Sequence, residues 1–114
     1  MAKSFDLEER TEDFARSVRK FVKCLPKTIA NIEDAKQVIR SSGSVGANYI
    51  EANEALSKKD FTMRIKICRK EAKESRYWLR LIDSGKDLDA TRNLLEKEAN
   101  ELMNIFGAIL QKTK

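Results

Sequence analysis

The amino-acid sequence predicts an all-α fold, an antiparallel up-down-up-down four-helix bundle, on the strength of three observations. The chain has 114 residues, the length of one domain, so we expect a single domain over residues 1–114. It is 41% hydrophobic and 36% charged with only 4 Gly and 1 Pro, whereas an all-β sandwich needs many turns rich in Gly and Pro. Apolar residues recur at helical spacing through nearly the whole chain.

The first predicted helix begins near Asp6, whose spacing to Glu9 resembles a capping box, and it ends before Pro26. Its apolar stripe is Leu7, Phe14, Val18, Phe21 and Leu25.

The second predicted helix covers residues 27–56. Its predicted core stripe is Ile32, Ala35, Val38, Ile39, Ser42, Val45, Gly46, Tyr49, Ile50, Asn53 and Leu56. Residues 41–46 (SSGSVG) lack the Lys-Ser/Thr pair of a phosphate-binding loop, and the apolar phase continues through them. We therefore interpret them as small residues that let helices approach closely.

The third predicted helix is capped by Ser57 and ends at Ser84-Gly85. Its apolar residues alternate at three-four spacing, as in a left-handed bundle: Phe61, Ile65, Cys68, Ala72, Ser75, Leu79 and Ile82. A fourth helix follows with the stripe Leu88, Leu95, Ala99, Leu102, Phe106, Ile109 and Leu110. Short connections imply that consecutive helices are antiparallel neighbours.

The excess of positive over negative charge is concentrated in the third helix. The chain carries a net charge of +5, and residues 58–82 alone hold nine cations against three acids. One predicted helix face carries Lys66, Arg69, Lys70, Lys73, Arg76 and Arg80, with Tyr77 among them to stack on a base. Such a face is typical of a polyanion site. The alternative is a solvated face whose cations pair with Glu71 and Glu74, and no helix-turn-helix, RRM, KH or zinc-finger pattern accompanies it.

Two further stripes predict contacts beyond an ordinary core. Met63, Ile67, Trp78 and Leu81 lie off the core direction of the third helix, beside Glu71 and Glu74, and we expect these four residues and Glu74 at an oligomer interface. An aligned apolar set favours self-association over a merely wide core. Leu94 and Ile105 form a weaker flank on the fourth helix. On the second helix, Arg40, Ser44, Asn48 and Glu51 form either a solvated face or a polar seam against a neighbouring subunit or helix.

Several functions are disfavoured. The chain has no His, no nucleophile with a base at a meaningful spacing and no metal-ligand pattern, so we expect no enzyme, cofactor, metal or small-molecule substrate. Cys24 and Cys68 are expected to be reduced and partly buried. No apolar run approaches the ~20 residues of a membrane helix and no leader precedes the first helix, so we expect a cytoplasmic protein without a membrane partner.

The residues themselves resemble a known family. Residues 37–52 (QVIRSSGSVGANYIEA), extended by 59–61 (KDF) and 68–79 (CRKEAKESRYWL), are similar to the signature of bacterial four-helix bundles encoded within intervening sequences of 23S ribosomal RNA genes. The joint pattern is Arg40, Ser44, Asn48, Glu51, Phe61 and Glu74. Ala52 stands where many relatives have Gly, which indicates a subgroup.

The resemblance implies a ring-shaped homopentamer. The family is similar to the accessory protein of diversity-generating retroelements, a basic pentamer that works with reverse transcriptase and RNA, so the basic face is expected to meet RNA. Our hypothesis is a non-catalytic, oligomeric RNA-binding protein acting through its third helix. The alternatives are an oligomeric scaffold that recruits a protein partner without binding nucleic acid, and an enzyme of unrecognised type.

Overall fold

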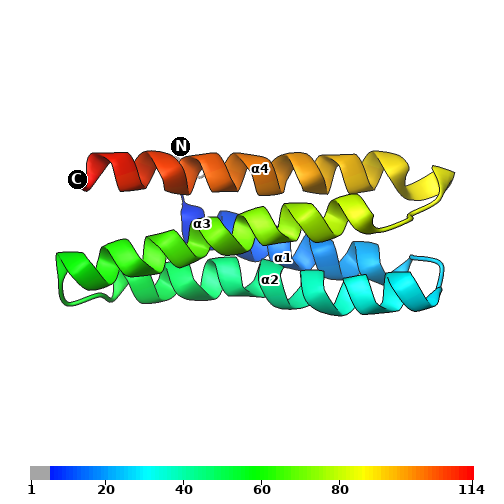
Figure 1. Ribbon diagram of the computed structural model, residues 1–114, viewed down its shortest axis with the longest axis horizontal. Coiled ribbons are helices and arrows are strands. Elements are labelled where there is room, and N and C mark those ends of the chain that lie inside the picture. The colour runs from blue at the N-terminus through cyan, green and yellow to red at the C-terminus, as the bar shows by residue number, and fades with distance from the viewer. Residues whose placement is uncertain (1–5) are drawn as a thin grey trace.

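The computed structural model describes residues 6–114 and folds them into a four-helix bundle. Its helices are α1 (Leu7–Lys23), α2 (Ile29–Asn53), α3 (Lys58–Leu81) and α4 (Asp89–Lys112), with a 3-10 turn, η2 (Lys86–Leu88), before α4. Consecutive helices run antiparallel (Figure 1), each packs on the next, and α1 also packs on α4 to close the bundle. The described residues contain no strand. The predicted all-α, up-down-up-down bundle is confirmed.

The helix starts follow from side-chain caps. The side chains of Asp6, Thr28 and Ser57 each accept a hydrogen bond, 3.1 Å long, from the backbone N–H three residues later. The predicted caps Asp6 and Ser57 are therefore confirmed. Helix α2 starts after Thr28 and ends at Asn53, so it is shorter at both ends than predicted. It runs unbroken through residues 41–46, as expected of a helix rather than a phosphate-binding loop.

The buried face of α2 matches the predicted stripe in its middle, where Ala35, Val38, Ser42 and Val45 are buried, and differs from it toward both ends. Ile32, Ile50, Asn53 and Leu56 were expected in the core but are exposed, and Leu56 is 98% exposed in the connection after α2. The residues buried in addition to the apolar ones are polar: Asn31, Ser41 and Ser42.

The buried hydroxyls are satisfied within the bundle. The hydroxyls of Ser41 on α2 and Ser75 on α3 lie 2.8 Å apart, and Ser75 Oγ also donates to the carbonyl of Glu71 over 2.9 Å. Hydrogen bonding removes the desolvation cost that would otherwise keep Ser out of a core. This is why the apolar pattern alone missed Ser41 as a buried residue of this helix.

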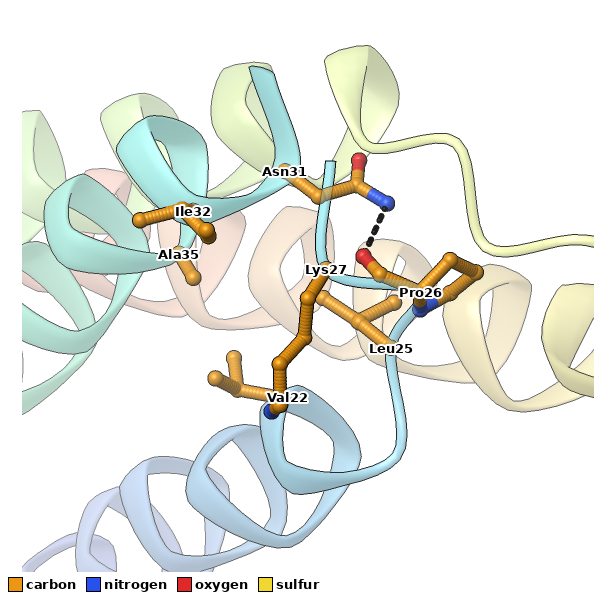
Figure 2. A pocket seen from close by; sticks show the side chains of 7 residues that line it. All are labelled: Val22, Leu25, Pro26, Lys27, Asn31, Ile32 and Ala35. Carbon is orange, nitrogen blue, oxygen red and sulfur yellow. Dashed lines mark hydrogen bonds between the residues drawn. The ribbon is translucent and has the colours of Figure 1, made fainter. Parts of the chain in front are cut away.

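A buried asparagine ties two connections together. Asn31 Nδ2 donates to the carbonyl oxygens of Pro26, over 3.0 Å, and of Asp83, over 2.8 Å, while its Oδ1 accepts from the Asp83 N–H over 3.1 Å. Figure 2 shows the bond to Pro26 in the turn between α1 and α2. Asp83 belongs to the connection between α3 and α4, where Gly85 takes a positive φ of 78°. The two connections at this end of the bundle thus form one hydrogen-bonded unit.

The two cysteines occupy different environments. Cys68 is fully buried and its Sγ donates to the Val45 carbonyl over 3.4 Å, whereas Cys24 is exposed, so the expectation of partial burial was wrong for both. Both are free thiols. The expectation that no leader precedes the first helix concerns residues 1–5, which lie outside the described residues.

Candidate nucleic-acid interface

The basic face of α3 divides into two parts. The lysines Lys66, Lys70 and Lys73 are all exposed, as is Tyr77; we call these four residues the outer ridge. The predicted arginines Arg69, Arg76 and Arg80 lie instead on the side of α3 that faces α4.

Contacts with residues of α4 show where the three arginine side chains lie. Arg76 Nη1 donates to Asn100 Oδ1, and Arg80 Nε donates to Glu96 Oε2 over 2.6 Å. Arg69 Nε lies 3.8 Å from the position that a Cβ on Gly107 would occupy. The three guanidinium groups therefore lie along the side of α3 next to α4, and those of Arg76 and Arg80 border a groove between the two helices.

The positive charge of the outer ridge is only partly compensated. In the described part of the chain, no carboxylate lies within ion-pair distance of Lys66, Lys70 or Lys73. The alternative interpretation of the basic face invoked pairs of Lys70 with Glu74 and of Lys73 with Glu71. Neither pair comes within ion-pair distance among the described residues, although the charge of Lys70 helps to lower the pKa of Glu74. Tyr77, which is 54% exposed, meets Trp78 edge-on with ring centroids 5.1 Å apart.

Glu71 and Glu74 belong to a network with α2. Arg40 Nη2 lies 3.0 Å from Glu71 Oε1 and 2.6 Å from Glu74 Oε1, and Trp78 Nε1 donates to Glu74 Oε1 over 3.2 Å. The hydrogen bond to Glu71 is the main reason that the pKa of Arg40 is raised. Burial alone would raise the pKa of Glu74, but hydrogen bonds from Trp78 and Arg40 outweigh it and lower that pKa.

A second polar cluster between α2 and α3 lies nearer the C-terminal end of α2. Asn48 Nδ2 donates to the carbonyl and the hydroxyl of Ser44, at 2.9 and 3.0 Å, and Arg64 Nη1 donates to Asn48 Oδ1 over 2.9 Å. The predicted polar stripe is therefore largely a seam between α2 and α3 of one chain. Glu51 is exposed and has no contact in this cluster. Sequence reasoning missed Arg64 as a partner, because its position on α3 gave no indication of the amide opposite.

Of the four residues in the predicted apolar stripe of α3, only two are exposed to solvent. Met63 and Leu81 are 51% and 50% exposed, whereas Ile67 and Trp78 are partly buried and Trp78 packs against the core. On α4, Leu94 is 68% exposed, while Ile105 packs against the core.

A further apolar surface lies where α1 meets α2. Figure 2 shows the small pocket there, lined by Val22, Leu25, Pro26, Lys27, Asn31, Ile32 and Ala35. Ile29, nearby in sequence, is 84% exposed. Sequence reasoning missed this surface because it assigned Ile32 to the core.

Within residues 6–114, no three His, Cys, Asp or Glu side chains come together as a potential metal site. None of the described helices combines the length and hydropathy needed to cross a bilayer.

The fold and the charged face define a class: small antiparallel four-helix bundles with one strongly basic helix. The chain belongs to the 23S rRNA-intervening sequence protein family, whose sequence model matches residues 3–108. It is also similar to a solved structure of unknown function from the S23 ribosomal protein family of Bacteroides thetaiotaomicron. The two chains are 27% identical with a TM-score of 0.77, over 90% of this chain and 96% of the other. No protein of curated function matches the chain.

Proposed function

We propose that this protein is a non-catalytic, cytoplasmic homo-oligomer, a pentamer as the family resemblance implies, that binds structured RNA through α3. The observation that carries the proposal is the outer ridge, where three lysines have no carboxylate partner in the described residues. Membership of a family named for 23S rRNA intervening sequences is consistent with an RNA partner.

The physical basis of binding is electrostatic. Lys66 and Lys73 are seven residues apart, about 10 Å along the helix axis. Each phosphate neutralised by a lysine releases counterions, so three contacts predict a log–log salt slope near −2 for a single strand and nearer −3 for a duplex. Tyr77 beside the lysines offers a ring on which an unpaired base can stack.

The test is fluorescence anisotropy with a labelled 23S rRNA hairpin and an unrelated hairpin, repeated across salt concentrations. The triple variant Lys66→Glu, Lys70→Glu, Lys73→Glu is expected to abolish salt-sensitive binding. Its matched control reverses three exposed lysines near the end of α1: Lys20→Glu, Lys23→Glu, Lys27→Glu. Binding by neither RNA, or equal losses in the two triple variants with both folded by circular dichroism, would contradict the proposal.

Self-association is the second part of the proposal. The half-exposed side chains of Met63 and Leu81 support it, because an aligned apolar pair on a charged helix is better placed against a second copy than in water. Analytical ultracentrifugation is expected to detect an oligomer that Met63→Glu with Leu81→Glu dissociates. Leu56→Glu, at a more exposed leucine outside this stripe, should leave the oligomer intact. A strict monomer at high micromolar concentration would contradict this part.

The same exposed apolar side chains support one alternative, an oligomeric scaffold that recruits a protein partner. An intact oligomer that binds neither hairpin at low salt would favour the scaffold over the RNA-binding protein.

A further inference from the structure

A polar groove lies between α3 and α4, beside the outer ridge but separate from it. It has a volume of about 410 Å³ and is lined by Arg76, Arg80, Asn93, Glu96, Lys97 and Asn100. The groove is shallow and open to solvent, so its volume does not distinguish it from other surface grooves of the chain, and its lining residues carry the argument. The lining residues of α4 did not feature in the predicted interface.

The charge in this groove is unbalanced. It contains three cations against the single carboxylate of Glu96, which is itself shared between Arg80 Nε at 2.6 Å and Arg92 Nη1 at 3.8 Å. Among the described residues, the hydrogen-bond partner of the Arg76 guanidinium is a neutral group, the amide oxygen of Asn100. Lys97 is exposed and pairs with no carboxylate in the described residues.

The free hydrogen-bonding groups are mainly donors. Because Asn100 Oδ1 accepts from Arg76, the group that Asn100 offers to a ligand is its NH₂. The two guanidinium groups and the Lys97 ammonium are donors without acceptors. A groove of cationic and amide donors is suited to a ligand rich in acceptor oxygens and negative charge, and guanidinium forks match phosphate geometry in particular.

We propose that this groove binds a phosphate group of the RNA backbone, with Lys97, Asn93 and Asn100 of α4 completing a site that Arg76 and Arg80 begin. This inference rests on the proposed function for the source of the phosphate. The outer ridge supplies general attraction, and the groove fixes the position of the backbone relative to α4.

A binding series tests the groove through two substitutions on α4. Asn100→Asp keeps the side-chain shape but sets a carboxylate against Arg76, and is expected to weaken RNA binding about tenfold, as loss of a charge-assisted hydrogen bond does. Asn104→Asp, an exposed position one turn further along α4, makes the same chemical change outside the groove and should weaken binding less than twofold. Lys97→Gln is expected to reduce the magnitude of the salt slope by about 0.7, one phosphate contact. Lys112→Gln on the same helix is its control.

A second measurement reports on the groove without requiring RNA affinity. The ¹⁵N-labelled protein is titrated with inorganic pyrophosphate and, separately, with a short oligouridylate. The side-chain resonances of Asn93, Asn100 and Arg76 are expected to shift with both probes, and those of Asn104 with neither.

The two proposals fail in distinguishable ways. If RNA binding depends on the outer ridge while the groove resonances do not move and Asn100→Asp behaves like Asn104→Asp, the groove inference is overturned and the proposed function stands. If RNA does not bind but pyrophosphate shifts the groove resonances, the proposed function fails and the groove is a phosphate site for another ligand. If neither probe shifts the groove resonances, the inference of a phosphate site in the groove is overturned.

Discussion

Gly46 on α2 lies so close to Thr11 on α1 that a Cβ added to it would be 2.8 Å from Thr11 Oγ1 and 3.2 Å from Thr11 Cβ. Thr11 cannot turn away without loss, because its hydroxyl donates to the Leu7 carbonyl over 2.7 Å and lies 3.1 Å from the Glu8 carbonyl. The predicted role of the small residues in close helix packing therefore applies to this glycine.

Alanine substitutions at the two glycines of α2 should have opposite effects. Gly46→Ala is expected to destabilise the protein by about 1–3 kcal/mol, because overpacking outweighs the gain in helix propensity. Gly43→Ala meets only the flexible Arg19 guanidinium, at 3.4 Å, and is expected to stabilise by up to about 1 kcal/mol. Urea unfolding measures both, and equal shifts of the midpoint would contradict the packing argument.

Because Arg40 pairs with Glu71 across the seam between α2 and α3, we expect its removal to lower the stability of the protein. Arg40→Met keeps the apolar stem but leaves Glu71, which is only 8% exposed, without its cationic partner. We expect a loss of about 1–3 kcal/mol, less than for a fully buried pair because Arg40 is half-exposed.

Two variants control this measurement. Arg16→Met breaks an exposed pair with Glu12 and should cost no more than about 0.5 kcal/mol. Adding Glu71→Gln to Arg40→Met should recover part of the loss, since no buried carboxylate then remains unpaired. If Arg40→Met costs no more than Arg16→Met, the seam does not stabilise the fold.

The lowered pKa of Glu74 predicts that the stability of the protein depends on pH. This pKa is lower in the folded protein than the ordinary value of 4.5. The contribution of Glu74 is therefore fully present above pH 4.5 and is lost as the pH falls through the lowered folded pKa. The stability difference between the wild type and Glu74→Gln should be constant near neutral pH and shrink in acid. Urea titrations at a series of pH values test this, and a difference that grows in acid would contradict it.

The cysteines should differ in reactivity. Burial raises the pKa of the Cys68 thiol to about 12, so it stays protonated and inaccessible in the folded protein. A thiol reagent near neutral pH should label one cysteine, Cys24, rapidly in the native protein and two in denaturant. Cys24→Ser should remove the native reaction, and rapid labelling of that variant would show that the core opens around Cys68.

Much of the fold could be predicted, because helical periodicity and capping residues are local properties. The stripe on α3 from Ile65 to Ile82 is buried as expected. The full set of buried residues on α2 could not be derived in this way, because Ser41 is buried through a hydroxyl partner 34 residues away on α3.

The candidate site was partly predictable for a related reason. A cluster of cations on one helix is visible in sequence, but whether each one is free depends on another helix. Among the described residues, Lys73 forms no ion pair, whereas Arg80 pairs with Glu96 of α4 and Glu71 pairs with Arg40 of α2. Partners of this kind become known only when the helices are packed.

The hydrogen bonds of Asn31 make the two ends of the bundle unequal. At one end, the turn at Pro26 and the connection at Asp83 are joined through a single side chain, so cutting or lengthening either would disturb both. At the other end, the connection between α2 and α3 presents the almost fully exposed Leu56. Insertions and circular permutations succeed at exposed connections whose backbone is free of such ties. The chain can therefore be opened next to Leu56, ahead of the Ser57 cap of α3, and this is a suitable place to attach a reporter or a further domain without disturbing the basic face of α3.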